Sequence, residues 1–369
     1  MTEAGSPLVR IFASTPLYLQ GPGALGQVGA VAARLGQSPV IVIDAQIQAL
    51  FVDTLQSGFA LPVPVVAFAG EVTDTAIASA AERCVGADVV VAVGGGKTLD
   101  AGKAVALRLS LPVISVPTIA STDGPASRGI AMYDDAHRLV RVDQMPSNPA
   151  AVIVDSRVVA HAPVRFLRAG IGDAIAKTFE AEACWAGNGL TKHGTRATHS
   201  ARAIAFAAYR MLREHAVEGC RDAERHEVSE ALEATIEACV LLSAMGFENG
   251  GLSVAHSVTR GLMTLRGARD RLHGEHVAYG TLVQLAAEHR WDELADLASF
   301  LANTGLPTSL AALGVPSPAL HDIEDIADRT MASPHVKTLA YPLTAADLVV
   351  AVEHVERLAG ETRATPTHT

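Results

Sequence analysis

Short apolar runs alternate with helical patterns along the chain as far as residue 160. Each apolar run ends in a polar or turn residue, and a helical pattern, such as that of residues 76–85, fills several of the intervals. Parallel strands need long crossover connections, which helices usually provide, so this alternation predicts a parallel sheet with helices on its faces. The predicted strands are residues 39–44, 62–68, 88–93, 112–116 and 151–155.

The pattern of hydrophobic residues changes after this alternation of strands and helices. Residues 130–141 contain two short apolar runs around a polar turn, which predicts an antiparallel hairpin. Farther on, apolar residues recur three and four positions apart, for example in 204–212 and 231–240, which indicates helices. We therefore predict an α/β domain over residues 1–162 and an all-α C-terminal domain over residues 163–369.

A glycine turn follows one of the predicted strands. The run from Val89 ends in Gly94-Gly95-Gly96 and Lys97, and a helical pattern begins near Thr98. A strand, a glycine turn and a helix N-terminus expose backbone N–H groups to an anion, and glycine lets a phosphate approach closely. The sequence matches neither GxxxxGK[ST] nor GxGxxG, so a plain structural turn stays an alternative. Lys97, one of only five lysines in the chain, favours the pyrophosphate of a dinucleotide.

Polar residues follow two more of the predicted strands. Asp44 closes residues 39–44, and a loop rich in hydroxyl groups, Thr118–Ser127, follows residues 112–116. The carboxyl ends of parallel strands meet at one edge of a sheet, where α/β proteins bind their ligands. These strand ends and the glycine turn therefore predict one crevice, in which a ligand contact is favoured over an ordinary polar loop.

Three residues of the C-terminal half form a candidate metal-ligand set. Asp173 belongs to a GIGD sequence that we predict to open a helix over residues 174–183, where an acid usually only complements the helix dipole. His256 lies on a mostly apolar helical stripe, which more often holds a core histidine. Gly274, which lies between His273 and His276, predicts a helix start. One carboxylate and two imidazoles suit Zn²⁺ or Fe²⁺ with an open position. The spacing is not a local metal motif, so structural roles stay open at this point.

Composition narrows the classes of partner. A net charge of -10 and an aromatic content of 4% argue against nucleic-acid binding. The N-terminal sequence MTEAGSPLVR lacks the features of a signal peptide, and no apolar run has the ~18 residues of a membrane span. The four cysteines are widely spaced and form no CxxC, as in reduced thiols. We expect a cytoplasmic protein that binds neither nucleic acid nor membranes.

Five stretches together carry a resemblance to a known family. They are GGGKTLDAGKA (94–104), VPTIASTDGPAS (116–127), GIGDAIAKTFEA (170–181), GFENGGLSVAHS (246–257) and LHGEHVAYGTLVQL (272–285). In these motifs and their order, the chain resembles the glycerol dehydrogenases of the metal-dependent (iron-containing) alcohol dehydrogenase superfamily. The resemblance covers essentially the whole chain. It implies the dehydroquinate synthase-like fold, with a Rossmann-like α/β N-terminal domain, an all-α C-terminal domain, and NAD and Zn²⁺ (or Fe²⁺) in a cleft between them.

The same resemblance assigns roles to individual residues. The metal ligands would be Asp173, His256 and His273, with His276 only a neighbour, and Asp123 would contact a substrate hydroxyl. The resemblance also implies a homo-oligomer, either an octamer or a smaller multiple of dimers. NAD would be held by Asp44, Gly95, Gly96, Lys97, Thr118, Ser121, Ser127, Gly129 and Tyr133.

The reaction implied is the oxidation of a small polyol, with glycerol to dihydroxyacetone as the leading case and vicinal diols as further substrates. The metal would lower the pKa of a substrate hydroxyl, and a hydride would pass to the nicotinamide. Asp44 would accept hydrogen bonds from the adenosine ribose and repel a 2′-phosphate, which favours NAD over NADP.

Two other interpretations remain. One is a phosphorylated-substrate enzyme of the same fold, either a dehydroquinate-synthase-like cyclase or a glycerol-1-phosphate dehydrogenase. The glycine that follows Asp123, Gly124, resembles the pattern of the glycerol-1-phosphate dehydrogenases. A phosphorylated-substrate enzyme needs a basic phosphate pocket, for which Arg128 and Arg269 are among the few candidates. The other is a catalytically silent NAD-binding scaffold, against which the intact set of candidate ligands argues.

Overall fold

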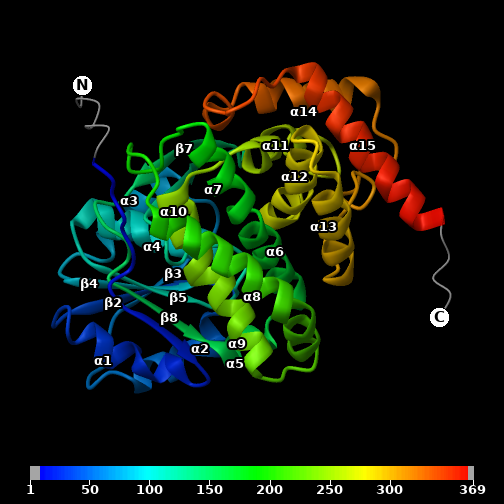
Figure 1. The fold of residues 1–369 in the computed structure, drawn as a ribbon. Coiled ribbons are helices and arrows are strands. Elements are labelled where there is room, and N and C mark those ends of the chain that lie inside the picture. The colour runs from blue at the N-terminus through cyan, green and yellow to red at the C-terminus, as the bar shows by residue number, and fades with distance from the viewer. Residues whose placement is uncertain (1–8, 365–369) are drawn as a thin grey trace. The chain divides into compact units, whose positions relative to one another are not determined.

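The computed structural model describes residues 9–364 and divides into two compact units (Figure 1). The unit that we call the α/β unit contains residues 13–167 and 221–244, and the helical unit contains the rest of the described chain. Most of the MTEAGSPLVR stretch and the end of the polar tail lie outside the described residues. This division does not test the expected bounds at residues 162 and 163, which stay a prediction.

The sheet of the α/β unit has six strands, and every neighbouring pair is parallel. Their order is β1-β8-β5-β4-β2-β3. The predicted parallel sheet is confirmed, but the edge strand β1 was not predicted, because its YLQG sequence is short, half-buried and without an apolar run. The strands are β1 (Tyr18–Gly21), β2 (Pro39–Asp44), β3 (Val65–Phe68), β4 (Val89–Gly94), β5 (Val113–Pro117) and β8 (Ala151–Asp155).

Helices cover both faces of this sheet, as Figure 1 shows. On one face Val42 of β2 belongs to the same buried core as Ile77 and Val105 of α3 and α4. On the other face the preceding residue, Ile41, shares a core with Leu55 of α2. Successive strand residues point to opposite faces, so a strand covered on both sides is apolar throughout. The helices are η1 (Ala24–Gln27), α1 (Val28–Ala32), α2 (Gln48–Ser57), α3 (Asp74–Glu82), α4 (Gly96–Leu109) and α5 (Ser156–His161).

A separate hairpin packs beside α4. Strands β6 (Gly129–Tyr133) and β7 (Leu139–Gln144) pair antiparallel, which confirms the predicted hairpin. Ile130 of β6 is fully buried in the core that contains α3 and α4, whereas β7 is mostly exposed. The hairpin therefore extends the α/β unit beyond its six-stranded sheet.

A helical segment from later in the chain completes the α/β unit. It contains α9 (Glu230–Glu237) and η2 (Ala238–Leu242), a π-helical stretch. The Gln20 side chain of β1 donates to the Glu233 carbonyl oxygen at 2.8 Å, which ties this segment to the sheet edge. The flanking helices α8 (His199–Glu224) and α10 (Ser243–Gly250) each have residues in both units.

The helical unit is organised around α12 (His273–Ala287), a helix buried along nearly its whole length. Helices α11 and α15 pack against α12, and α14 packs against both of them. This helix-rich C-terminal part agrees with the prediction. Its other elements are α6 (Val164–Ile175), α7 (Lys177–Ala186), α11 (Val254–Leu262), α13 (Trp291–Asn303), α14 (Leu320–Met331), η3 (Pro334–Val336) and α15 (Ala345–Ala364). Of α6, the part from Arg168 onward belongs to this unit.

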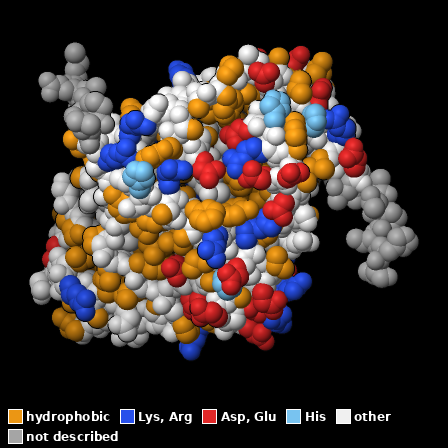
Figure 2. All heavy atoms as spheres, in the orientation of Figure 1, with side chains coloured by type: hydrophobic (Ala, Val, Ile, Leu, Met, Phe, Trp, Pro, Cys, Tyr) orange, Lys and Arg blue, Asp and Glu red, His pale blue; other side chains and the backbone are white. Residues whose placement is uncertain are grey.

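The surface mixes charges of both signs. On the face shown in Figure 2, Lys and Arg side chains lie interspersed with Asp and Glu side chains. Within residues 9–364, no single helix has both the length and the apolar composition to cross a bilayer. One bent pair of helical segments, Glu230–Gly250 with Val254–Leu262, passes that test by length and composition alone.

Candidate functional site

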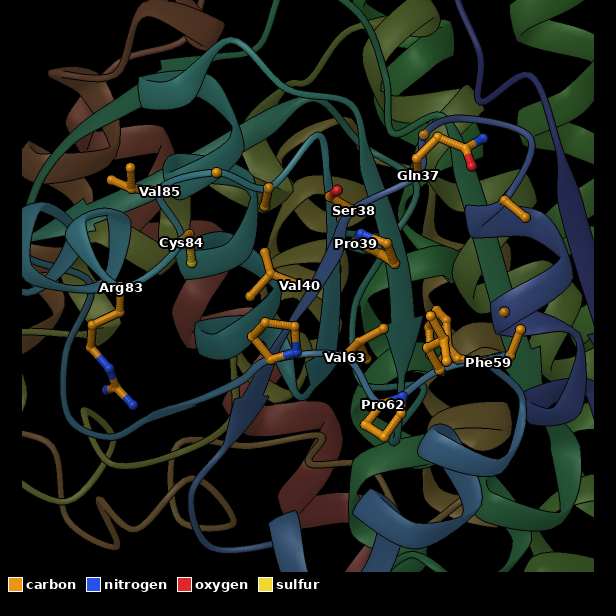
Figure 3. Close-up of a pocket in the computed structure, with 18 residues that line it drawn as sticks. Gln37, Ser38, Pro39, Val40, Phe59, Pro62, Val63, Arg83, Cys84 and Val85 are labelled. Atoms are coloured by element: carbon orange, nitrogen blue, oxygen red, sulfur yellow. The ribbon is translucent and has the colours of Figure 1, made fainter.

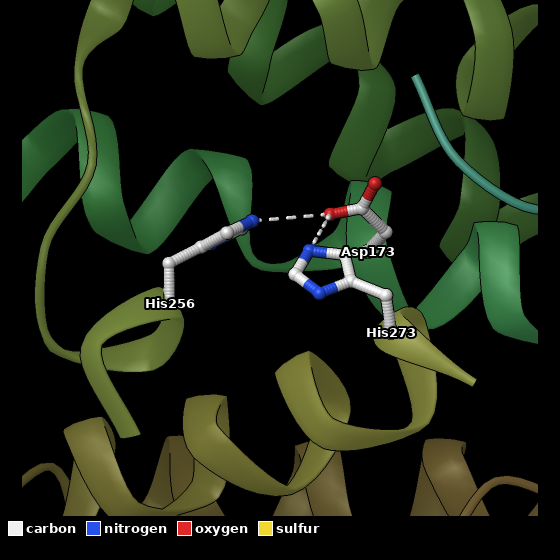
Figure 4. A group of neighbouring side chains, drawn as sticks. All are labelled: Asp173, His256 and His273. Atoms are coloured by element: carbon white, nitrogen blue, oxygen red, sulfur yellow. Dashed lines mark ion pairs between the residues drawn. The ribbon is translucent and has the colours of Figure 1, made fainter. Parts of the chain in front are cut away.

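Asp173, His256 and His273 come together in the helical unit (Figure 4). One potential ligand atom from each lies within 4.8 Å of the others. His256 Nε2 is 3.2 Å and His273 Nε2 is 4.0 Å from Asp173 Oδ1. The three residues come from α6, α11 and α12, so their meeting is a product of tertiary structure and not of local spacing.

The position of Asp173 corrects one prediction. Asp173 lies in the last turn of α6, and not in the first turn of a helix over residues 174–183. The next helix, α7, begins only at Lys177. The C-terminal end of a helix is its negative end, where a carboxylate is disfavoured. Dipole complementation therefore does not explain Asp173, and its neighbours must compensate its charge.

Two glycines let α6 and the start of α12 approach closely. A Cβ atom on Gly172 would lie 2.3 Å from the Gly274 carbonyl oxygen, and one on Gly274 would lie 1.7 Å from the Ala169 carbonyl oxygen. Neither position has room for a side chain, and the close contact carries His273, the first residue of α12, next to Asp173. The helix start predicted from Gly274 is confirmed.

The other histidine of this helix points elsewhere. The buried His276 ring places Nε2 2.8 Å from the Ala268 carbonyl oxygen. That hydrogen bond gives the ring a structural partner outside the group of three. His276 is therefore a neighbour of the group and not one of its members.

Glu180 of α7 fixes the orientation of His256. Its carboxylate lies 2.6 Å from His256 Nδ1 and also accepts the backbone N–H groups of Ser253 and His256. A carboxylate on Nδ1 favours the tautomer in which Nδ1 carries the proton and Nε2 has a free electron pair. Nε2 is the nitrogen that faces Asp173. Glu180 is fully buried and was not singled out from the sequence.

Lys177 is the second residue that sequence reasoning missed. Its ammonium donates to Asp173 Oδ1 at 2.7 Å and lies 3.1 Å from His256 Nε2. The side chain is only 1% exposed. Asp173, Lys177 and Glu180 are the charged residues, at positions i, i+4 and i+7, of the mostly apolar stretch GIGDAIAKTFEA. That spacing places them on one helical face and is the signal that could have revealed the group.

The electrostatic environment prepares two of these groups, Asp173 and His273, to bind a cation. Burial alone would raise the pKa of Asp173, but Lys177 and the two histidines hold it far below its ordinary value, so the carboxylate is ionised. Desolvation by the groups packed around its ring lowers the pKa of His273 more than Asp173 raises it, which favours the neutral ring, although 44% of the side-chain surface stays exposed. Burial alone would also lower the pKa of His256, but Glu180 raises it above its ordinary value, which favours the protonated ring, so at His256 the environment opposes the binding of a cation.

The donor set fits a divalent metal such as Zn²⁺ or Fe²⁺. It offers one ionised carboxylate oxygen and two imidazole nitrogens, and a carboxylate already supports one of the rings. Three protein ligands leave a coordination position open, as in catalytic rather than structural sites. The His273 side chain keeps 44% of its surface exposed, so the group can be reached from solvent.

The predicted dinucleotide residues lie in the α/β unit, several of them around the carboxyl end of β4. Gly94 has a φ of +151°, and a Cβ atom there would lie 2.9 Å from Thr98 Cβ and 3.2 Å from the Cβ of Asp44. The Thr118 N–H donates to the Gly94 carbonyl oxygen at 3.1 Å. The ends of β2, β4 and β5 therefore meet at this turn. Helix α4 begins at Gly96, slightly earlier than predicted, so Gly95 and Gly96 form its N-terminus.

Lys97 is held by a carboxylate that the sequence did not indicate. Its ammonium and His137 Nδ1, from the hairpin turn, each lie 2.8 Å from Glu71 Oε2. Burial would raise the pKa of Glu71, but these two partners hold it below its ordinary value of 4.5. The ion pair links the glycine turn to the tip of the hairpin. Tyr133, at the end of β6, is joined to the same region because its N–H donates to the Val72 carbonyl oxygen at 2.9 Å.

The loop after β5 is anchored by a fourth residue that the sequence did not indicate. The fully buried Lys103 of α4 donates to the carbonyl oxygens of Gly124 and Gly129, at 3.0 and 2.5 Å, and pairs with Asp100. Ser127 Oγ accepts the Gly129 N–H at 3.2 Å, and Ser121 lies earlier in the same loop. Lys103 thereby fixes the segment that carries several of the predicted cofactor residues.

Asp123 occupies the middle of this loop. It is 8% exposed, and its Oδ2 accepts the Ser243 hydroxyl at 3.0 Å. Ser243 belongs to the helical segment that completes the α/β unit. The side chain of Asp123 is therefore positioned by contacts within that unit, as a residue that orients a ligand needs to be.

A pocket of about 580 Å³ opens at the amino ends of the parallel strands, opposite their carboxyl ends (Figure 3). Its lining includes Pro39, Pro64 and Ala87, which stand at or just before the starts of β2, β3 and β4. Arg83 is the only charged residue among those that line it. Ligands of parallel sheets bind at the carboxyl ends of strands, so this pocket is separate from the predicted dinucleotide edge.

Comparisons with known proteins found similar sequences and structures over most of the chain. The family model described as iron-containing alcohol dehydrogenase matches residues 19–163. The chain is 37% identical to a glycerol dehydrogenase of Thermotoga maritima, over 92% of this chain and 95% of that protein. It is also 37% identical to a glycolaldehyde reductase of Halobacterium salinarum, over 87% and 90% of the two chains. The crystal structure of a glycerol dehydrogenase from Schizosaccharomyces pombe superposes with a TM-score of 0.91 at 31% identity, covering 97% of this chain and 94% of that one.

Proposed function

Because this chain belongs to the iron-containing alcohol dehydrogenase family, we propose that it oxidises glycerol and related vicinal diols with NAD and a divalent metal. The chain is an oxidoreductase, and full-length similarity to several glycerol dehydrogenases favours a polyol substrate. The observation that carries the metal-dependent part of the proposal is the convergence of Asp173, His256 and His273 within 4.8 Å.

The helical unit would supply the metal site. Asp173 and the two histidines would hold the ion, Zn²⁺ or Fe²⁺, and Glu180 would keep His256 Nε2 directed at it. When bound, such an ion supplies Lewis-acid polarisation of a substrate hydroxyl. The open coordination position suits the substrate oxygen.

The α/β unit would hold the dinucleotide and orient the polyol. The N-terminus of α4, at Gly95, Gly96 and Lys97, would bind the pyrophosphate through backbone N–H groups and the positive end of the helix dipole. Asp44 would accept hydrogen bonds from the adenosine ribose and disfavour a 2′-phosphate. The remaining NAD contacts in the proposal are Thr118, Ser121, Ser127, Gly129 and Tyr133.

Asp123 is the residue that we propose to orient the substrate. Its carboxylate would accept a hydrogen bond from a second hydroxyl of the diol, while Ser243 restrains it from the other side. The reaction would transfer a hydride from the carbon of the oxidised hydroxyl to the nicotinamide, and the hydroxyl proton would be released to solvent.

The phosphorylated-substrate alternative is less favoured. Arg269, one of the arginines considered for a phosphate pocket, is largely exposed and lies beside Asp270, with 3.6 Å between the two side chains. Such a neighbour weakens its attraction for a phosphate. The closely related proteins described above are also glycerol dehydrogenases or a glycolaldehyde reductase.

Assembly and location complete the proposal. We propose a homo-oligomer, either an octamer or a smaller multiple of dimers, that acts in the cytoplasm. Light scattering of the purified protein tests the first statement. Fractionation of cells that express the chain tests the second.

The decisive experiment is a substrate panel with and without a chelator. NADH formation is followed with glycerol, 1,2-propanediol and glycerol 1-phosphate, using protein whose zinc content has been measured. We expect turnover of glycerol and the diol that is lost with the chelator and recovered when Zn²⁺ is added back.

The other outcomes are equally informative. Activity on the phosphate ester alone would move the function to the phosphorylated-substrate class. Absence of turnover by zinc-replete protein on all three compounds would overturn glycerol dehydrogenase as the function.

A further inference from the structure

The most unusual feature of the candidate metal centre is the buried ammonium inside it. Lys177 Nζ lies within hydrogen-bond distance of two atoms that a metal ion would use, Asp173 Oδ1 and His256 Nε2. His256 Nδ1 is taken by Glu180, so Nε2 is the acceptor that the ammonium meets. The lysine thus uses the same electron pairs as a metal ligand set would.

We propose that Lys177 is a built-in competitor of the metal: its ammonium must leave Asp173 and His256 before the ion binds, and it thereby weakens and slows metal binding. This inference rests on the metal site of the proposed function. It goes beyond that function because it concerns how readily the ion enters and leaves. It also gives a role to a residue that is neither a proposed metal ligand nor a proposed dinucleotide contact.

The charges of the buried cluster support this competition. Asp173 and Glu180 carry two negative charges, and the ammonium of Lys177 carries one positive charge, in side chains that are at most 2% exposed. A divalent ion added beside an unmoved Lys177 would place three positive charges against two negative ones. Like charges a few ångströms apart repel strongly where water cannot screen them.

The structure also offers the ammonium another contact. Lys177 Nζ lies 5.5 Å from the centroid of the Phe247 ring, within the range of a cation–π interaction. A lysine side chain has four rotatable bonds, so rotation within the side chain is the simplest route by which Nζ would leave Asp173.

The test is the zinc affinity of Lys177→Met, measured by competition with a chromophoric chelator. Methionine keeps most of the volume and removes the charge, so we expect zinc to bind at least about tenfold more tightly than to the wild type. The metal-free variant should melt at a lower temperature, because Asp173 keeps a buried charge without its cation. Its melting temperature should therefore rise more on zinc addition than that of the wild type. A merely structural lysine would instead give equal or weaker zinc binding, which would overturn the inference.

Lys192 provides a matched control. Its ammonium lies 5.3 Å from the same Phe247 ring, so Lys192→Met removes a nearby positive charge. We expect this variant to change zinc affinity by less than about threefold. An equal gain in both variants would contradict direct competition and indicate a general effect of charge.

Two further results keep the test decisive. Zinc binding by the wild type is measured first, and its absence would contradict the proposed metal site and not the role of Lys177 alone. If Lys177→Met does not fold, a crystal structure of the zinc-loaded wild type replaces it. Zinc bound while Lys177 stays within hydrogen-bond distance of both Asp173 and His256 Nε2 would overturn the inference.

Discussion

The two candidate sites of this protein use different chemical groups, mainly backbone in one and side chains in the other. At the carboxyl end of β4, the predicted dinucleotide edge consists largely of backbone, with a glycine turn, a helix N-terminus and short polar loops. In the helical unit, the candidate metal centre consists of titratable side chains from α6, α7, α11 and α12. The first joins turns and loops that directly follow strands of one sheet, and the second joins side chains carried by four helices.

This contrast determines how each site responds to substitution. A backbone site tolerates most changes of side chain but not the addition of a Cβ atom where a ligand approaches. A buried cluster of charges behaves in the opposite way, because each group compensates another. The loss of one group leaves its partner as a buried charge without compensation. Substitutions in the helical unit should therefore have larger effects than those at the glycine turn.

The largest effect is expected for Asp173→Asn. It removes the only carboxylate of the proposed ligand set, and we expect zinc affinity and kcat/KM to fall by more than about 100-fold. This loss is larger than the one caused by removing a residue that only hydrogen-bonds to a metal ligand. Metal content and steady-state kinetics of the purified variant measure both. Because this change also leaves Lys177 without a carboxylate, His273→Gln serves as a second variant, and Asp328→Asn, at an exposed position of α14, serves as the control. Full zinc content in both ligand variants would refute the assignment.

A smaller loss is expected for Glu180→Gln. The amide oxygen can still accept the backbone N–H groups of Ser253 and His256, but the negative charge beside His256 Nδ1 is gone. Removing a residue that hydrogen-bonds to a metal ligand, as Glu180 does to His256, changes metal affinity by about 10–100-fold. Chelator competition measures the loss, and Glu182→Gln, on the exposed side of the same helix, should leave the affinity unchanged.

At the glycine turn, Gly96→Ala should separate binding from stability. No atom lies within 4 Å of a Cβ atom added at Gly96, so the melting temperature should stay the same. If the dinucleotide approaches this helix N-terminus, the KM for NAD should rise by about tenfold, because the methyl group takes its space. An unchanged KM would place the dinucleotide elsewhere.

Gly94→Ala is the contrasting variant for that experiment. Gly94 has a φ of +151°, and its added Cβ atom would lie 2.9 Å from Thr98 Cβ. It should therefore lose about 1–3 kcal/mol of stability as well as NAD affinity. Comparison of the two alanine variants by thermal unfolding shows which effect comes from the fold and which from the ligand.

The smallest effect is expected at Glu71. Its pKa lies below 4.5 in the folded chain, so its ion pairs stabilise the fold above that pH and the stabilisation is lost as the pH falls through the lowered value. Lys97 and His137 have largely exposed side chains, so we expect less than about 1 kcal/mol. Glu71→Gln should unfold more easily than the wild type at pH 7, and this difference should shrink towards pH 4. Glu82→Gln, at the exposed end of α3, should show no such pH dependence.

Some features of the fold could be predicted from the sequence because they are local. The strands around Ile41 and Val91 are continuous apolar runs, which is the pattern of strands buried on both faces, and Gly274 correctly marked the start of α12. The edge strand at Leu19 escaped notice because only one neighbour and half-burial define it. The helix end at Asp173 was misplaced because α6 and α7 follow each other with a single residue between them, and the apolar pattern runs through the junction.

The sequence by itself determined the parallel sheet, the hairpin, the glycine turn and the types of residue available for chemistry. These depend on periodicity and on the backbone freedom of glycine, which act within a few residues. Only the tertiary structure decided that Gly172 and Gly274 bring two helices into contact, that Glu180 supports His256, and that Lys177 lies among the candidate ligands. Such contacts depend on how helices distant in sequence pack and on which buried charges must compensate one another. The spacing of Asp173, Lys177 and Glu180 indicates that these three lie close together, but not which histidines they meet.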